Sequence, residues 1–275
     1  MSEITPEVWA SCPQVIRSRY RFLSCLSGEE HYAVMLCQTI ATDKKVIIKA
    51  SDSLEIADRL RKENQLLTMI HSRQDPRADL FPHVVELYHE TENSFTVLIR
   101  DYVSGHSIES LVESRQDRPG LHREKSIQYL KEVLNLLSFL HHLDPVIIHR
   151  DIKPQNIIVD ELDHCHLIDL DIARSPNDCK NAPDTFIIGT RLTAPPEQFG
   201  YQQTSIRSDI YSAGVLLLYC MTGSYYLSAA KELDPFLRRI VKHATNFDPN
   251  QRYASDEAMC RALGRASKFS FWNSR

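Results

Sequence analysis

The feature that most constrains the fold is a change in the spacing of apolar residues near residue 100. Between residues 20 and 99 they form short runs rich in β-branched side chains, with one helical interruption, which predicts a small sheet with one helix. Farther along they recur at every third or fourth position, as at Ile127, Leu130 and Leu134, which predicts helices with one buried face. Residues 210–221 are apolar almost all round, so we expect a helix inside the core of the second half.

These patterns divide the chain into four parts. We expect an N-terminal extension over residues 1–19, a sheet lobe over 20–101, a helical lobe over 102–267 and a C-terminal tail over 268–275. At roughly 150 residues per domain, a chain of 275 residues is long enough for one large domain or two lobes with a sizeable core.

The charge balance and the apolar runs exclude several classes of function. The chain has 32 Lys and Arg against 36 Asp and Glu and no run of basic residues, so we expect no nucleic-acid partner. The longest apolar stretch, residues 213–221, is shorter than the roughly 20 residues that cross a bilayer, and the first residues do not resemble a secretory signal. Seven cysteines without a CxxC spacing fit a reducing compartment. We therefore expect a cytoplasmic protein with no membrane span in this chain.

One carboxylate interrupts the apolar stripe of the helix predicted in the first half. Glu63 stands on that stripe between Leu60 and Leu67. A buried carboxylate is costly unless a cation meets it, and Lys49 ends the apolar strand predicted over residues 46–48. We therefore pair Lys49 with Glu63. The alternative is that both side chains are solvated, as most Lys and Glu are.

A polar loop between two apolar runs is the second candidate region. Residues 149–156 read His-Arg-Asp-Ile-Lys-Pro-Gln-Asn. The runs on either side, 146–148 and 157–159, contain only Val and Ile, and we expect both to be strands.

This loop and the next strand end supply the groups that phosphoryl transfer needs. Asp151 can accept a hydroxyl proton, Lys153 can neutralise a phosphoryl oxygen, and Asn156 offers an amide oxygen to a metal. Asp169 follows a further apolar strand and adds a carboxylate suited to Mg²⁺. In such reactions the protein mainly positions the groups and neutralises charge.

Together these residues resemble the eukaryotic-type protein kinases, over about residues 20–265, and look closest to the bacterial serine/threonine kinases of that family. The resemblance implies a bilobal α+β fold, with a small antiparallel-sheet lobe carrying one helix and a larger, mainly α-helical lobe. It also implies transfer of the γ-phosphate of ATP, with Mg²⁺ or Mn²⁺, to serine or threonine hydroxyls of a protein substrate.

The resemblance assigns roles to individual residues. Catalysis falls to Asp151 and Lys153, and metal binding to Asn156 and Asp169. The nucleotide-binding residues it implies are Lys49, Glu63, Val34, Tyr102, Val103 and Ile158. The structural or regulatory residues it implies are Arg150, Thr185, Thr190, Glu197, Asp209 and Arg252. Within this last group, Glu197 is expected to pair with Arg252, and Asp209 to brace the catalytic loop from the buried helix.

The resemblance also carries expectations about regulation and attachment. Thr185 lies in a polar, Pro-containing stretch about midway between Asp169 and Glu197, so we expect autophosphorylation there, with Arg150 as the cation that receives the phosphate. A transient homodimer would serve this reaction. Bacterial relatives often continue into a membrane span, which leaves open an anchor beyond residue 275.

The chain departs from the family pattern at several positions. Ser27, Glu29 and Tyr32 stand where the phosphate-covering loop has glycines, and the Glu29 carboxylate would repel phosphate. Arg100 stands at the back of the adenine pocket, where an apolar residue is common, and a cation there needs a partner or a route to solvent. Asp171 replaces the glycine two residues after the metal-binding aspartate. These departures make a pseudokinase, a binding module with weak or no turnover, the alternative.

Overall fold

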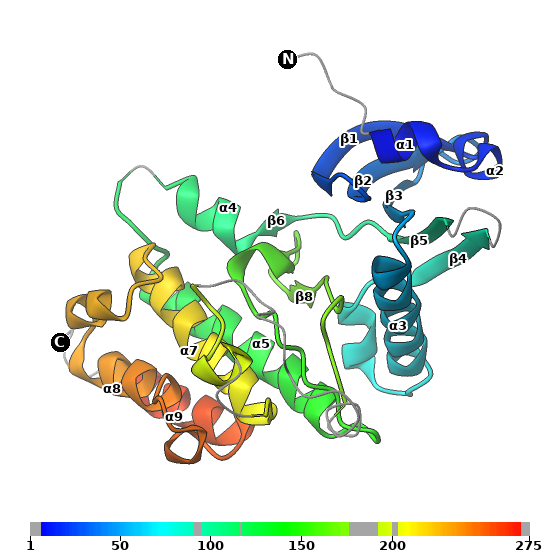
Figure 1. Cartoon of the computed structure of the whole chain (residues 1–275). Helices are drawn as coiled ribbons and strands as arrows, with labels where there is room; N and C mark the ends of the chain where they lie inside the picture. Colours follow the sequence, from blue (N-terminus) through cyan, green and yellow to red (C-terminus); the bar gives the residue numbers. More distant parts are fainter. Residues whose placement is uncertain (1–6, 91–94, 116, 176–191, 200–202, 271–275) are drawn as a thin grey trace. The chain divides into compact units, whose positions relative to one another are not determined.

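The computed structural model describes residues 7–90, 95–115, 117–175, 192–199 and 203–270. The chain divides into two compact units, one up to Val103 and one from Ser104 onward (Figure 1). The first unit is built on an antiparallel sheet and the second mainly on helices, which confirms the predicted α+β fold.

The first unit contains a five-stranded sheet in the order β1-β2-β3-β5-β4, in which every neighbouring pair is antiparallel. Its strands are β1 (Tyr20–Glu29), β2 (Tyr32–Thr39), β3 (Lys45–Ser51), β4 (Val84–Glu90) and β5 (Phe95–Asp101). Its helical elements are α1 (Glu7–Ser11), α2 (Gln14–Arg17), α3 (Leu54–His71) and the 3-10 turn η1 (Pro76–Leu80). The predicted single helix is α3, whereas α1 and α2 lie in the segment that we expected to be an extension.

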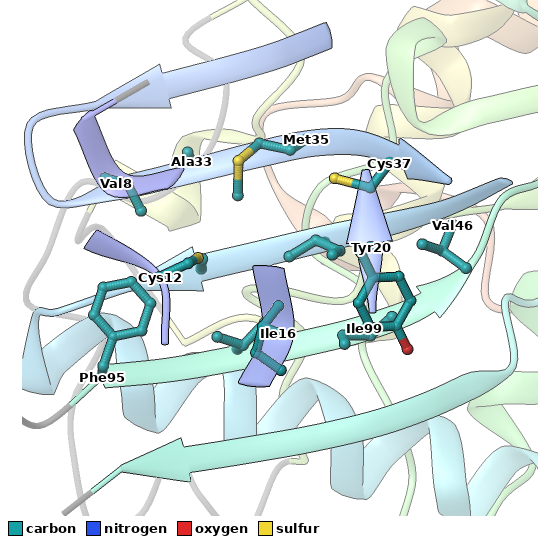
Figure 2. Close-up of a cluster of buried hydrophobic side chains, with 13 residues drawn as sticks. Val8, Cys12, Ile16, Tyr20, Ala33, Met35, Cys37, Val46, Phe95 and Ile99 are labelled. Carbon is teal, nitrogen blue, oxygen red and sulfur yellow. The ribbon is translucent and has the colours of Figure 1, made fainter. Parts of the chain in front are cut away.

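The two short helices cover one face of the sheet. Val8, Cys12 and Ile16 belong to one buried cluster with alternate side chains of β2, β3 and β5, such as Met35 and Ile99 (Figure 2). Successive side chains of a strand point to opposite faces, so the intervening residues of these strands face the other way. That second face meets α3.

α3 buries the stripe that the residue spacing predicts. Leu60, Glu63, Leu67 and Ile70 are all buried. The carboxylate of Glu63 therefore stands inside the first unit, in an otherwise apolar row.

The second unit is organised around one buried helix. Its helices are α4 (Ile108–Glu113), α5 (Arg123–His141), α7 (Ile206–Thr222), α8 (Pro235–Ala244) and α9 (Asp256–Ser270). Its 3-10 turns are η2 (Pro154–Asn156), η3 (Pro196–Phe199), η4 (Leu227–Glu232) and η5 (Pro249–Gln251), and its short strands are β6 (His106–Ser107), β7 (Ile157–Val159) and β8 (Cys165–Leu167). α7 packs against α5 and α8, and α5 packs against α9. The apolar run at 210–221 thus forms the central helix that the sequence predicts.

Residues 146–148 are not the strand that we expected. Ile148 forms only an isolated antiparallel bridge with Arg174, and the amide of Ile147 donates to the carbonyl of Leu140 at the end of α5. Ile147 and Ile148 are both buried. The run is therefore apolar because it lies in the core, and its backbone pairs with a helix end and a loop instead of a sheet.

The C-terminal boundary also differs from the prediction. α9 continues to Ser270, so the tail expected over residues 268–275 begins inside a helix, and residues 271–275 lie outside the described part of the chain.

Within the described residues, every helix is too short or too polar to pass through a lipid bilayer.

Candidate functional site

Glu63 of α3 accepts hydrogen bonds from two cations on the sheet. Lys49 Nζ on β3 lies 2.6 Å from Glu63 Oε2, and Arg100 Nη1 on β5 lies 3.0 Å from Glu63 Oε1. All three side chains are at most 4% exposed. The pairing of Lys49 with Glu63 predicted from the sequence is confirmed, and Glu63 is the partner that Arg100 needs.

The strand register brings these cations to one face of the sheet. Lys49 pairs with Val34 of β2 on one side and with Leu98 of β5 on the other, and Ile47 pairs with Arg100. Directly paired residues of antiparallel strands point to the same face. Val34, Lys49 and Arg100 therefore share the face that meets α3.

The predicted phosphate-covering segment is a tight β1–β2 hairpin. Glu29 ends β1, Tyr32 begins β2, and the two residues pair directly. Ser27 is also a strand residue, paired with Val34. Neither residue of the turn between the strands has a positive φ. The hairpin therefore closes without the glycines that the family pattern has at these positions.

The other predicted nucleotide-binding residues lie within a strand or directly after one. Tyr102 and Val103 follow β5 directly and are half-buried, and Lys45 Nζ stands 5.5 Å from the centre of the Tyr102 ring. Ile158 is the middle residue of β7 in the second unit, where it is half-buried. These positions are compatible with the predicted contacts, which stay predictions.

Two side chains hold the carboxylate of Asp151 in the second unit. Lys153 Nζ lies 2.7 Å from Asp151 Oδ2, and Asn156 Nδ2 donates to the same oxygen at 2.9 Å. Asn156 Nδ2 also donates to the main-chain carbonyl of Asp151 at 3.1 Å. Three of the residues predicted for catalysis and metal binding are thus brought together by one loop, and the orientation of the Asp151 carboxylate is fixed.

The carboxylate of Asp209 on α7 anchors the backbone of this loop. Its Oδ2 accepts from the amide of His149 and its Oδ1 from the amide of Arg150, both at 2.8 Å. Arg150 has a φ of 69°, a left-handed conformation uncommon for a residue with a side chain. The two charge-assisted bonds that these amides donate to the buried Asp209 hold the backbone in this conformation, immediately before Asp151.

His141 at the end of α5 joins two buried carboxylates, a contact that the sequence analysis missed. Its Nε2 lies 2.9 Å from Asp209 Oδ2, and its Nδ1 lies 2.6 Å from Asp256 Oδ2 on α9. Burial opposes the charged imidazole, but the two carboxylates outweigh burial and raise the pKa of His141 to about 9. Burial likewise disfavours the charged form of Asp209, yet His141 holds the pKa of that carboxyl below its usual range. The anchor of the loop at residues 149–156 is therefore itself fixed by a cation.

The two predicted metal ligands stand at adjoining ends of paired strands. Asn156 precedes β7, Asp169 follows β8 by two residues, and the amide of Ile168 donates to the carbonyl of Asn156 at 3.1 Å. Because the amide nitrogen of Asn156 bonds to Asp151, its amide oxygen points away from that carboxylate. An amide oxygen and a carboxylate are hard donors, so the residues present fit Mg²⁺ or Mn²⁺.

Asp171 keeps an ordinary backbone in place of the expected glycine. Its amide lies 3.3 Å from Asp169 Oδ1, and it is not among the described residues with a positive φ. The segment therefore forms here without the conformational freedom of glycine.

Glu197 and Arg252 form the ion pair that the resemblance implies. Arg252 Nη1 and Nη2 lie 2.7 and 2.9 Å from the two carboxylate oxygens of Glu197, and the hydroxyl of Ser208 on α7 donates to the same carboxylate at 2.7 Å. Next to Glu197, Gln198 donates to the main-chain carbonyl of Arg150 at 2.9 Å. The segment 192–199 is thus fixed to α7 and to the loop at residues 149–156. Thr185 and Thr190 lie outside the described residues.

Known proteins provide an independent comparison. A family model described as the protein kinase domain matches residues 28–262. The chain is 25% identical over 272 residues to the serine/threonine-protein kinase PrkC of Bacillus subtilis, covering 89% of this chain and 40% of that protein. It is 27% identical over 279 residues to the serine/threonine-protein kinase PknA of Corynebacterium glutamicum, covering 91% of this chain and 56% of that protein. A third relative, the serine/threonine-protein kinase D of Synechocystis, is 26% identical over 255 residues, covering 82% of this chain and 47% of that protein. The chain spans 40–56% of the length of these relatives.

Proposed function

The chain belongs to the protein kinase domain family, and from this membership we propose that it transfers the γ-phosphate of ATP to serine or threonine hydroxyls of a protein substrate. The observation that carries the proposal is the fixed carboxylate of Asp151, held through Oδ2 by Lys153 and Asn156 on a loop anchored by Asp209. A carboxylate of set orientation beside a cation is what a hydroxyl nucleophile and a phosphoryl group require.

In this proposal Asp151 orients the substrate hydroxyl and accepts its proton. Lys153 neutralises charge on the phosphoryl group as it transfers. Their 2.7 Å ion pair keeps both side chains at the same place before substrate arrives. Such preorganisation lowers the barrier because the groups need not reorient during the reaction.

Most of the proposed nucleotide contacts come from the first unit, and Ile158 comes from the second. Lys49, held by Glu63, is the cation proposed for the α- and β-phosphates. Val34, Ile158 and the backbone of Tyr102 and Val103 are the residues proposed for the adenine ring. The serine/threonine class rests on Lys153, which the resembling kinases of that class share, and on the printed names of the relatives.

Asn156 and Asp169 would hold the metal ion. Mg²⁺ or Mn²⁺, when bound there, would neutralise the phosphate oxygens and align the nucleotide. The contribution of this chain is to keep the Asn156 amide oxygen turned away from Asp151, so that it could serve as a ligand.

We further propose that the kinase phosphorylates its own Thr185 through a transient homodimer, and that it acts in the cytoplasm. The charge of Arg150, directly before Asp151, supports the first point, because a phosphate adds about −1.5 to −2 charges and forms strong bonds with guanidinium. Mapping phosphate on the dephosphorylated chain after incubation with Mg²⁺ and ATP, with Thr185→Ala as the comparison, tests it. Full activity of Thr185→Ala after incubation would contradict it.

The central experiment measures label transfer from γ-labelled ATP to a protein substrate in the presence of Mg²⁺. We expect label on serine and threonine with the wild-type chain, and none with Asp151→Asn, which should still bind nucleotide. Glu161→Gln, an exposed carboxylate of the same unit, is the matched control and should keep full activity. Nucleotide binding without transfer by the wild-type chain would overturn the proposal and identify a pseudokinase.

A further inference from the structure

Two imidazoles and a carboxylate meet at the C-terminal end of α3. His71 is the last residue of α3, Asp79 belongs to η1, and His83 directly precedes β4. One ligand atom from each of the three lies within 4.8 Å of the other two. Within the described residues, this is the group of His, Cys, Asp and Glu side chains that meets this geometry. None of the three has a role in the proposed phosphoryl transfer.

The two imidazole rings lie directly against each other, and the exposed ring of His83 must turn for both to bind one ion, because imidazole lone pairs lie in the ring plane and stacked planes do not converge on one point. The rings of His71 and His83 are stacked, with centroids 3.7 Å apart and planes inclined by 20°. Zn²⁺ binds histidine nitrogen at about 2.0–2.1 Å with tetrahedral geometry, which separates two nitrogen ligands by roughly 3.4 Å. His83 Nε2 lies 3.9 Å from Asp79 Oδ1, so the separation of these two ligand atoms is close to that of two ligands on one tetrahedral ion.

A hydrogen bond selects the nitrogen of His71 that can bind a metal. Its Nε2 lies 3.1 Å from the carbonyl oxygen of Pro82, and because a carbonyl only accepts, Nε2 carries the proton. The lone pair of the neutral ring is then on Nδ1. Metal-binding histidines usually donate their other ring nitrogen to a carbonyl or carboxylate in this way, which fixes the ring orientation. The carbonyl groups at the end of α3 also favour a cation there.

We propose that His71, Asp79 and His83 form a binding site for a borderline first-row divalent cation such as Zn²⁺, with water completing the coordination. Two imidazoles and one carboxylate are a donor set typical of Zn²⁺, Ni²⁺ or Cu²⁺, whereas Mg²⁺ and Ca²⁺ prefer oxygen donors. The ion would tie the end of α3 to η1 and to the start of β4. Because α3 carries Glu63, this cross-link would stabilise the helix that holds Lys49.

The first test is calorimetric titration of the chain with Zn²⁺ in excess Mg²⁺, which occupies the oxygen sites. We expect one Zn²⁺ site that is lost or weakened at least tenfold in His83→Ala and in Asp79→Asn. Both side chains are more than half exposed, so these variants should fold normally. The matched control is His31→Ala, because exposed His31 lies 3.0 Å from Asp52 and 4.0 Å from Glu30 but has no second imidazole.

The second test is thermal unfolding with and without Zn²⁺. An ion that binds only the folded state raises the melting temperature, so we expect Zn²⁺ to raise it in wild type and in His31→Ala but not in His83→Ala. Equal Zn²⁺ affinity in wild type and His83→Ala, or an equal loss in His31→Ala, would overturn the proposal. Neither readout depends on kinase activity, so failure here leaves the proposed function untouched.

Discussion

Arg100 donates to the carboxylate of Glu63 at 3.0 Å. Because Lys49 pairs with the same carboxylate, Glu63 binds two buried cations. Arg100 occupies a position where the family commonly has an apolar residue. Its guanidinium is therefore part of a buried ion-pair cluster in the first unit and is held away from solvent.

Because two cations share the carboxylate of Glu63, we expect three variants of this cluster to differ in their free energy of unfolding. Glu63→Gln leaves two buried cations facing each other and should lower the free energy of unfolding by about 3–5 kcal/mol. Lys49→Met and Arg100→Met each leave one intact ion pair with Glu63 and should cost less. Urea unfolding of the three variants measures the ranking. Equal losses for Arg100→Met and Glu63→Gln would mean that the packing of Arg100, and not its charge, matters.

Variants of the neighbouring carboxylates Asp169 and Asp171 distinguish a residue that binds the metal from one that only shapes the loop. Asp169→Ala should abolish the dependence of nucleotide affinity on Mg²⁺, because it removes a hard ligand. Asp171→Gly should leave that dependence intact, since Asp171 stands at the position of the family glycine. Nucleotide titrations with and without Mg²⁺ provide the measurement. If Asp171→Gly loses the Mg²⁺ dependence instead, the metal carboxylate is Asp171.

The raised pKa of His141 predicts a pH dependence of stability. Its folded-state pKa of about 9 exceeds the ordinary value of 6.5, so the imidazolium stabilises the fold fully below pH 6.5 and loses this contribution as the pH rises toward 9. The loss should be on the order of 3 kcal/mol in wild type and absent in His141→Asn. Urea unfolding at both ends of this range measures it. The control is His142→Asn, whose side chain is 71% exposed; a flattened pH profile in this variant would argue against His141.

The short helices before the sheet should contribute measurably to the stability of the first unit. Ile16 is fully buried, so Ile16→Ala should lower the free energy of unfolding by about 2–5 kcal/mol. Val15 is 45% exposed, and Val15→Ala should change the free energy of unfolding by less than about 0.5 kcal/mol. Thermal or urea unfolding compares the two. Equal free energies of unfolding for Ile16→Ala and Val15→Ala would show that packing of these helices on the sheet does not stabilise the first unit.

The pairing of Lys49 with Glu63 could be predicted because both residues break an apolar pattern, and a buried charge requires a counter-charge. The ion pair of Arg100 with Glu63 could not be predicted, because it depends on the register between β3 and β5, which places Arg100 opposite Ile47. His141 stands on the apolar stripe of α5, but its two partners come from residues 209 and 256, far along the chain. Contacts set by tertiary packing leave no local signal.

Two errors in the predicted fold have local causes. The run at 146–148 satisfies the apolar criterion for a strand, and composition alone does not distinguish a buried loop from a buried strand. The first helices are too short for a periodicity analysis, although Val8, Cys12 and Ile16 recur at every fourth residue, and this spacing is the signal that could have identified them.

The covering of the sheet by α1 and α2 bears on where a recombinant chain can begin. The match to the kinase family starts at residue 28, and a protein cut there would lack both helices and most of β1. Met35, Ile48, Val97 and their neighbours, now fully buried, would form an exposed apolar sheet face beside a new edge strand. Such a protein would tend to self-associate through that face, and its insolubility would be mistaken for a failure of the kinase fold itself.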